Sequence, residues 1–234
     1  MIVGIHQPNY LPGVSYFTKI LQSDVFILLD TVQFSKGNWT NRNRIKSPHG
    51  EIMLTVPISI KGQSFQKISE ININMNEPNW RKKHLKTLEQ YYSKGNYYHQ
   101  YLSLLKDIYS QDWKLLSIMN IWIIKEICSL LNIQKEIICA TDLTSTDLSA
   151  TDLLIFLTKE VGGDSYLSGQ GGRKYLEVEK FLASGVKLVY AKFTAAPYPQ
   201  LYGGFIPNLS VVDLLLNEGP NAIEILNNSG TVEE

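Results

Sequence analysis

Residues 5–13 read Ile5-His6-Gln7-Pro8-Asn9-Tyr10-Leu11-Pro12-Gly13, and this stretch decides the fold. The apolar run from Met1 to Gly4 before it has the length and residue types of a buried strand, and residues 16–21 after it are typical of a helix. The polar side chains therefore lie at a strand-to-helix turn, where open α/β sheets bind ligands. We expect a pocket there, lined by His6, Gln7, Asn9 and Tyr10.

A second strand is predicted over residues 24–30, and it ends in the carboxylate of Asp30. The loop after it is dense in side chains that donate hydrogen bonds, so two polar loops leave adjacent strand ends. This second loop favours a ligand pocket over the alternative, in which Pro8 and Pro12 only form a turn and the polar residues cap the helix. The candidate substrate-binding residues of the second loop are Gln33, Lys36, Trp39, Asn41, Arg42 and Arg44.

A glycine-rich turn is the second candidate site. Three glycines at the start of a predicted helix let backbone N–H groups approach a phosphate, although their spacing matches neither G-x-G-x-x-G nor the P-loop. The predicted phosphate-binding residues are Ser168, Gly169, Gly171, Gly172 and Arg173, with Arg42 and Arg44. Turns that leave parallel strands open at the same edge of a sheet, so we expect His6 and Gly171 to face one cleft.

Six motifs occur along the chain as a set: His6-Gln7-Pro8-Asn9-Tyr10-Leu11-Pro12, Tyr16-Phe17-x-Lys19-Ile20, Asp30-x-Val32-Gln33-Phe34, Trp39-x-Asn41-Arg42-Asn43, Tyr166-Leu167-Ser168-Gly169 and Leu209-Ser210-x-x-Asp213. Together they resemble the motifs of the WbqC-like family of bacterial polysaccharide-locus proteins. The resemblance covers nearly the whole chain. It departs from the family at Gly13, where a tryptophan is usual, which implies a more open pocket wall.

The resemblance implies an N-acyltransferase, of a glycyl or other aminoacyl group, that acts on a nucleotide-linked amino sugar in the synthesis of O-antigen or another surface polysaccharide. Amide formation needs a base for the incoming amine and donors for the developing oxyanion. We expect His6 to be the base, oriented by Asp30, and Asn9, Gln33 and Asn41 to be donors. The acyl donor stays open among ATP plus amino acid, aminoacyl-tRNA and acyl thioester.

Two other functions stay open beside the transferase. One is a non-catalytic module that binds a sugar nucleotide or glycan, which needs the same pocket but no base. The other is an ATP-dependent amide ligase, which would release phosphate or pyrophosphate. The oligomeric state is also open.

The order of predicted elements indicates an α/β fold with layers and a largely parallel sheet. We expect one domain over residues 1–234 with a helical insertion over 77–132. By fold-level analogy the opening is Rossmann-like and similar to nucleotidyltransferases, although it lacks the second histidine of their usual pair. Further strands are predicted over 51–58, ended by Pro57 and Lys61-Gly62, and over 68–73, 136–140 and 186–190. Capping boxes are predicted at Ser149 and Ser210, and residues 230–234 are predicted to fray.

The composition of the chain indicates which binding partners and which cellular compartment to expect. The chain has 22 Lys plus Arg and 22 Asp plus Glu, so no net charge steers it to nucleic acid, and we expect no DNA partner. Cys128 and Cys139 lie in apolar segments, so we expect both to be buried, unpaired thiols in a reducing compartment. The histidine and cysteine spacing predicts no metal site. We also expect no structural cofactor. With no secretory signal or membrane span in the sequence, we expect a cytoplasmic protein.

Overall fold

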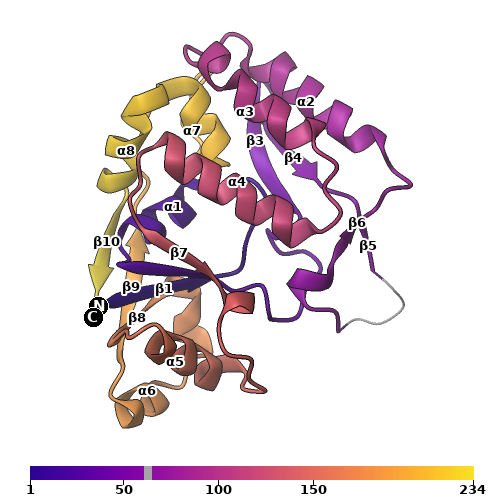
Figure 1. Cartoon of the computed structure of the whole chain (residues 1–234). Coiled ribbons are helices and arrows are strands. Elements are labelled where there is room, and N and C mark those ends of the chain that lie inside the picture. The colour runs from indigo at the N-terminus through magenta and orange to yellow at the C-terminus, as the bar shows by residue number, and fades with distance from the viewer. Residues whose placement is uncertain (61–64) are drawn as a thin grey trace.

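The computed structural model describes residues 1–60 and 65–234, and it confirms the α/β class with a mostly parallel central sheet (Figure 1). The six strands of this sheet stand in the order β10-β9-β8-β1-β2-β7, and β10 alone runs antiparallel to its neighbour. Their bounds are β1 (Ile2–His6), β2 (Val25–Leu28), β7 (Glu136–Cys139), β8 (Ser165–Gly169), β9 (Lys187–Phe193) and β10 (Gly230–Glu233).

The α-helices of the described residues include one that follows β1, as predicted, and three within residues 77–132. They are α1 (Val14–Leu21), α2 (Asn79–Tyr92), α3 (Tyr98–Ser110), α4 (Leu116–Leu130), α5 (Ala150–Glu160), α6 (Val178–Ser184), α7 (Val211–Glu218) and α8 (Ala222–Asn228). Two small antiparallel sheets complete the fold. They pair β3 (Arg42–Ser47) with β4 (Gly50–Thr55), and β5 (Ile58–Ser59) with β6 (Asn72–Ile73).

Successive side chains of the central strands point to opposite faces of the sheet and contribute to two separate hydrophobic clusters. Phe26 and Leu28 of β2 join the larger cluster, which also holds the buried faces of α1, α2, α3, α4 and α7. Ile27, between them, joins the smaller cluster under α5 and α6, together with Val3 and Ile5 of β1. Side chains of successive strand residues point to opposite faces, so helices cover both faces of the sheet (Figure 1).

Residues 77–132 contribute α2, α3 and α4, which follow β6 and precede β7 in the chain. Their buried side chains, such as Leu88, Leu105 and Ile123, belong to the same hydrophobic cluster as Phe17 of α1. The three helices therefore bury their apolar faces in the main core on one side of the sheet. No helix in the described parts of the chain is long and apolar enough to cross a membrane.

Some local predictions were wrong. Residues 68–73 do not form one strand, because Ile68–Glu70 is a 3₁₀ helix whose Ser69 N–H donates to the Asp30 carbonyl. Only Asn72–Ile73 is a strand. The strand predicted over 51–58 divides into β4 and β5, and Lys61-Gly62, expected to end it, lies outside the described residues.

The chain terminus and one helix start also differ from the prediction. Residues 230–233 form β10 instead of fraying, and the carboxylate of Glu233 lies 2.8 Å from Lys192 Nζ on β9. The capping box predicted at Ser149 is absent. Ser149 makes no side-chain cap bond, and the Asp152 carboxylate pairs with Lys180 at 2.7 Å. Ser210 does cap α7, since its hydroxyl oxygen accepts from the Val212 N–H.

Candidate functional site

Two cavities adjoin at the carboxyl ends of β1 and β8. The first, of about 390 Å³, is lined by Asn9, Trp39 and Arg44 among others, and the second, of about 450 Å³, by Gln7 and Gly171 among others. Because β1 and β8 are parallel neighbours, their carboxyl ends lie at the same edge of the sheet. The expectation that His6 and Gly171 face one cleft is therefore confirmed, since both line the second cavity.

Three residues line both cavities, and they are His6, Lys19 and Gly169. His6 ends β1, Lys19 lies on α1, and Gly169 ends β8. A molecule in the first cavity and a molecule in the second would meet at these three residues. This junction is the centre of the candidate site.

His6 is held in one orientation without a carboxylate. Its Nδ1 lies 3.1 Å from the Gln7 carbonyl oxygen, and its ring meets the edge of Tyr16 at 4.9 Å between centroids. A carbonyl only accepts, so Nδ1 carries the proton and Nε2 keeps its lone pair. Burial, followed by the charge of Lys19, lowers the pKa of His6 to about 4. The ring is therefore a neutral imidazole at neutral pH.

The expected pairing of His6 with Asp30 is wrong. Asp30 is buried, and its carboxylate accepts one hydrogen bond from the Thr141 N–H at 3.1 Å and one from the Thr141 hydroxyl at 2.9 Å. Within residues 1–60 and 65–234, no hydrogen bond joins Asp30 to His6. Asp30 fixes the segment after β7 to the end of β2, which is a structural role.

Lys19 lies at the junction of the two cavities, and the sequence analysis assigned it no role. Its side chain is 5% exposed, and Nζ donates to the Ile5 carbonyl oxygen at 2.7 Å and lies 5.9 Å from the ring centroid of Tyr166. Burial lowers the pKa of this ammonium to about 7. The sequence spacing of Lys19 from Tyr16 could have predicted its burial. Residues three apart lie on one face of a helix, and the aromatic side chain of Tyr16 indicates the buried face.

The first cavity holds several residues of the two polar loops. Asn9 is 7% exposed, and its side chain makes no hydrogen bond to any residue that the structure describes. Trp39 is 42% exposed, and the Arg44 guanidinium lies 5.3 Å from its ring centroid. Asn43, which was not predicted, also lines this cavity, and its amide donates to the Leu11 carbonyl oxygen at 2.7 Å.

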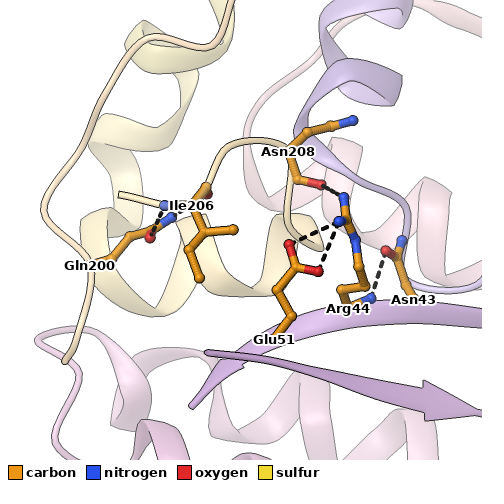
Figure 2. Close-up of polar contacts among 6 residues, drawn as sticks. All are labelled: Asn43, Arg44, Glu51, Gln200, Ile206 and Asn208. Carbon is orange, nitrogen blue, oxygen red and sulfur yellow. Dashed lines mark hydrogen bonds and ion pairs between the residues drawn. The ribbon is translucent and has the colours of Figure 1, made fainter. Parts of the chain in front are cut away.

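The charge of Arg44 is already paired with a carboxylate. One Arg44 nitrogen, Nη1, donates to both carboxylate oxygens of Glu51 at 2.8 and 2.9 Å, and the other, Nη2, lies 3.5 Å from the Asn208 carbonyl oxygen (Figure 2). The Arg44–Glu51 pair is partly exposed. Exposed pairs of this kind contribute about 0–1 kcal/mol, so a bound phosphate can compete with Glu51 for Arg44.

Two predicted substrate contacts serve the fold instead. Tyr10 is fully buried, and its hydroxyl lies 3.0 Å from His84 Nδ1 and 2.6 Å from the Tyr109 hydroxyl, so its predicted place in the pocket is wrong. The side-chain amide of Asn41 donates to the Val56 carbonyl oxygen at 3.0 Å, next to the β3–β4 hairpin.

Three further predicted contacts lie outside the two cavities. Arg42 donates to the Gly37 carbonyl oxygen, within its own loop. Lys36 is exposed on that loop. Gln33 lines a separate cavity of about 710 Å³ near the ends of β2 and β7. This third cavity shares Val32, Ala150 and Leu153 with the second cavity, so the two adjoin.

The glycine turn forms a 3₁₀ helix over Gln170–Lys174 directly after β8. A Cβ added at Gly169 or Gly171 would meet no heavy atom within 4 Å, whereas at Gly172 it would lie 2.1 Å from Ser168 Oγ. Ser168 is buried, and its hydroxyl donates to the Gly169 carbonyl oxygen. Only Gly172 is thus required by packing, while Gly169 and Gly171 have open space over the cavities.

Arg173 lies away from the predicted phosphate site. Its guanidinium stacks 3.8 Å from the ring centroid of Tyr190 and lies 3.5 Å from the Glu233 carboxylate. Its Nε donates to the side-chain oxygen of Gln170. Arg173 is not among the residues that line the two cavities, so the structure does not place it with the glycine turn as a phosphate contact.

The lining of the two cavities is basic. The described residues that line them include His6, Lys19 and Arg44 but no aspartate or glutamate. In the parts of the chain that the structure covers, no three histidine, cysteine, aspartate or glutamate side chains are grouped so as to hold a metal ion. Cys128 and Cys139 are free and buried, and burial raises the pKa of both thiols. Neither thiol lines the two cavities.

The comparisons with known proteins agree with the motifs. Residues 7–225 match the WbqC-like protein family. The chain is 34% identical over 226 residues to the uncharacterized protein Rv1507c of Mycobacterium tuberculosis, and the match covers 96% of each chain. No solved structure matches the chain. On the family match and on this relative, the chain belongs to the WbqC-like family.

Proposed function

We propose that the protein transfers an acyl group, glycyl or another aminoacyl group, to the amine of a nucleotide-linked amino sugar in bacterial surface-polysaccharide biosynthesis. One observation carries the proposal: two cavities meet at His6, Lys19 and Gly169. A group transfer needs two substrates whose reacting atoms meet, and binding both in fixed positions supplies much of the rate increase. Membership of the WbqC-like family is compatible with a transferase.

His6 at the junction and Asn9 in the first cavity would supply the chemistry that amide formation needs. The amine nitrogen attacks the acyl carbon, and the carbonyl oxygen becomes an oxyanion. The side-chain amide of Asn9 lines the first cavity and has no protein partner among the described residues, so it would donate to that oxyanion. As the C–N bond forms, the nitrogen becomes acidic, and the free Nε2 of His6 accepts its proton. The oxyanion then collapses to a carbonyl, the bond between the acyl carbon and the leaving group breaks, and His6 returns the proton to the departing group.

Binding assays and product analysis test this function. A thermal-shift screen should include nucleotide-linked amino sugars, ATP with glycine, and acyl-CoA. A ligand at about one hundred times its Kd adds ~2.7 kcal/mol of stability. Pairs that stabilise the protein are then incubated together, and the amide product is measured by mass spectrometry. No product from any stabilising pair would contradict the proposal.

A second candidate function is a non-catalytic module that binds a sugar nucleotide. It is favoured by the absence of a carboxylate partner for His6 and by the lowered pKa of that ring, about 4, which makes His6 a weak base. The His6→Gln variant separates the two functions. A transferase should lose turnover by ~100-fold or more while it keeps most of its affinity, whereas a binder has no turnover to lose. An ATP-dependent ligase would release phosphate or pyrophosphate, which the same incubations measure.

A further inference from the structure

Lys19 is a buried cation without a carboxylate partner. An ammonium has three N–H donors, and within the described parts of the chain only the Ile5 carbonyl oxygen accepts from Lys19 Nζ, at 2.7 Å. The Tyr166 ring, 5.9 Å away, offers a π-face and no negative charge. Burying an ion without a counter-ion is costly, so the folded chain holds Lys19 in an unfavourable state.

The surroundings of Lys19 carry no compensating negative charge. The titratable residues that line either cavity with it, among those described, are His6, Tyr16, Arg44, Tyr166 and Tyr175. None of these is an acid that is ionised at neutral pH. A ligand that brings a negative charge to the junction would supply the missing counter-ion.

Open space lies beside this charge. Gly169 and Gly171 line the second cavity with Lys19, and a Cβ at either position would meet no atom within 4 Å. Neither glycine is among the residues with positive φ. The unliganded fold therefore does not need glycine at these two positions. A ligand that contacts the backbone there would need it.

We infer that Lys19 binds an anionic group of the ligand, a phosphate or a carboxylate, where the two cavities meet. This anion site rests on the proposed function, because Lys19 would hold the negative charge that one substrate brings to the junction. Anion binding is measured without turnover. A protein that binds no anion could therefore still be a transferase, and a protein that binds the anion could still lack transferase activity.

Binding of an anion should take up a proton. Burial lowers the pKa of Lys19 to about 7, so at pH 8 most of the unliganded protein has a neutral amine. An anion stabilises the ammonium form and raises the pKa, and the proton comes from the buffer. The same anion offsets the Lys19 charge that lowers the pKa of His6, so it also raises the pKa of that ring.

Calorimetry of the complete chain tests the inference. Sulfate, UDP and acetate are titrated at pH 8 in two buffers with different ionisation enthalpies, because the difference in binding enthalpy gives the number of protons taken up. Sulfate keeps a constant charge near this pH, so its proton uptake comes from the protein. Binding of UDP without acetate would identify a phosphate site, and binding of acetate without UDP a carboxylate site. Uptake approaching one proton per anion is expected for wild type, and no binding of any of the three anions overturns the inference.

Lys19→Met is the matched variant, because methionine has nearly the same length and no charge. We expect it to fold, since it removes a buried ion, and to bind the anion at least about tenfold more weakly, with the proton uptake abolished. Lys106→Met, at an exposed position of α3 that lines neither cavity, is the control and should bind as wild type does. Wild-type anion affinity in Lys19→Met overturns the inference.

Discussion

Asp30 and Thr141 are joined by two hydrogen bonds across 111 residues of sequence, from the Thr141 N–H at 3.1 Å and the Thr141 hydroxyl at 2.9 Å. Thr141→Val keeps the shape and the N–H but leaves one carboxylate oxygen of the buried Asp30 without its donor. We expect the free energy of unfolding, measured in urea, to fall by about 1–2 kcal/mol, with ligand affinity unchanged.

Thr144→Val is the control for this loss. Thr144 is exposed and bonds the exposed Glu160, so its replacement should change the free energy of unfolding by less than about 0.5 kcal/mol. If Thr141→Val kept full stability but lost ligand affinity, Asp30 would belong to the site after all.

Asp30 and Tyr10 illustrate what the sequence could and could not predict. Strand-end positions follow from apolar runs, so the parallel sheet and the meeting of His6 with Gly171 were predictable. The partners of a side chain depend on elements far along the chain. Asp30 meets Thr141 only because β7 pairs with β2, and Tyr10 meets His84 and Tyr109 only because α2 and α3 pack on its loop.

Lys19 and Asn9 show a second limit. A lysine in a helix is usually solvated, and its burial here follows from the packing of α1 on the sheet. Asn9 and Tyr10 are adjacent in a polar loop, and only the folded backbone decides that Asn9 lines the first cavity while Tyr10 enters the core. Residue type identified the loop, whereas three-dimensional packing selected the site residues within it.

Arg44 and Arg42 should differ in ligand binding. Arg44 lines the first cavity and lies over Trp39, whereas Arg42 donates to the Gly37 carbonyl oxygen and lies outside the cavity lining. We expect Arg44→Ala to weaken UDP binding by roughly tenfold, the cost of a charge-assisted contact, and Arg42→Ala to weaken it by less than about twofold. Calorimetric titration measures both. Equal affinity in the two variants would remove the phosphate role of Arg44.

His84 should make the fold sensitive to acid. Burial lowers the pKa of this ring to about 4 in the folded chain, against about 6.5 when it is unfolded. The unfolded state therefore binds a proton first as the pH falls, and the free energy of unfolding decreases between about pH 6.5 and pH 4. For His84 alone the decrease from pH 7 to pH 5 should be roughly 2 kcal/mol.

Denaturant unfolding of His84→Gln at pH 7 and pH 5 measures the contribution of His84. The variant loses the Tyr10 contact, so its free energy of unfolding at pH 7 should be lower than that of wild type. Between pH 7 and pH 5 that free energy should then decrease by roughly 2 kcal/mol less than in wild type. His49→Gln, in the exposed turn of the β3–β4 hairpin, is the control and should follow the wild-type pH dependence. The same loss between pH 7 and pH 5 in His84→Gln and in wild type would contradict the assignment.

Gly171 and Gly172 are adjacent but should respond in opposite ways to an added side chain. At Gly172 a Cβ would lie 2.1 Å from Ser168 Oγ and 2.8 Å from Leu176 Cδ1, so Gly172→Ala should lower the free energy of unfolding by about 1–3 kcal/mol. At Gly171 the space is open, so Gly171→Val should leave the melting temperature nearly unchanged while its side chain occupies part of the second cavity.

Chemical protection of His6 tests whether the side chain added in Gly171→Val blocks ligand binding in the second cavity. Diethyl pyrocarbonate modifies neutral imidazole, and His6 lines the same cavity as Gly171. A ligand that stabilises wild type should protect His6 from the reagent, as measured by peptide mass spectrometry. In Gly171→Val the protection should be lost at the same ligand concentration, although the protein stays folded. If the variant kept full protection, the ligand would lie in the first cavity alone, and the glycine turn would serve only to connect β8 to the helix that follows.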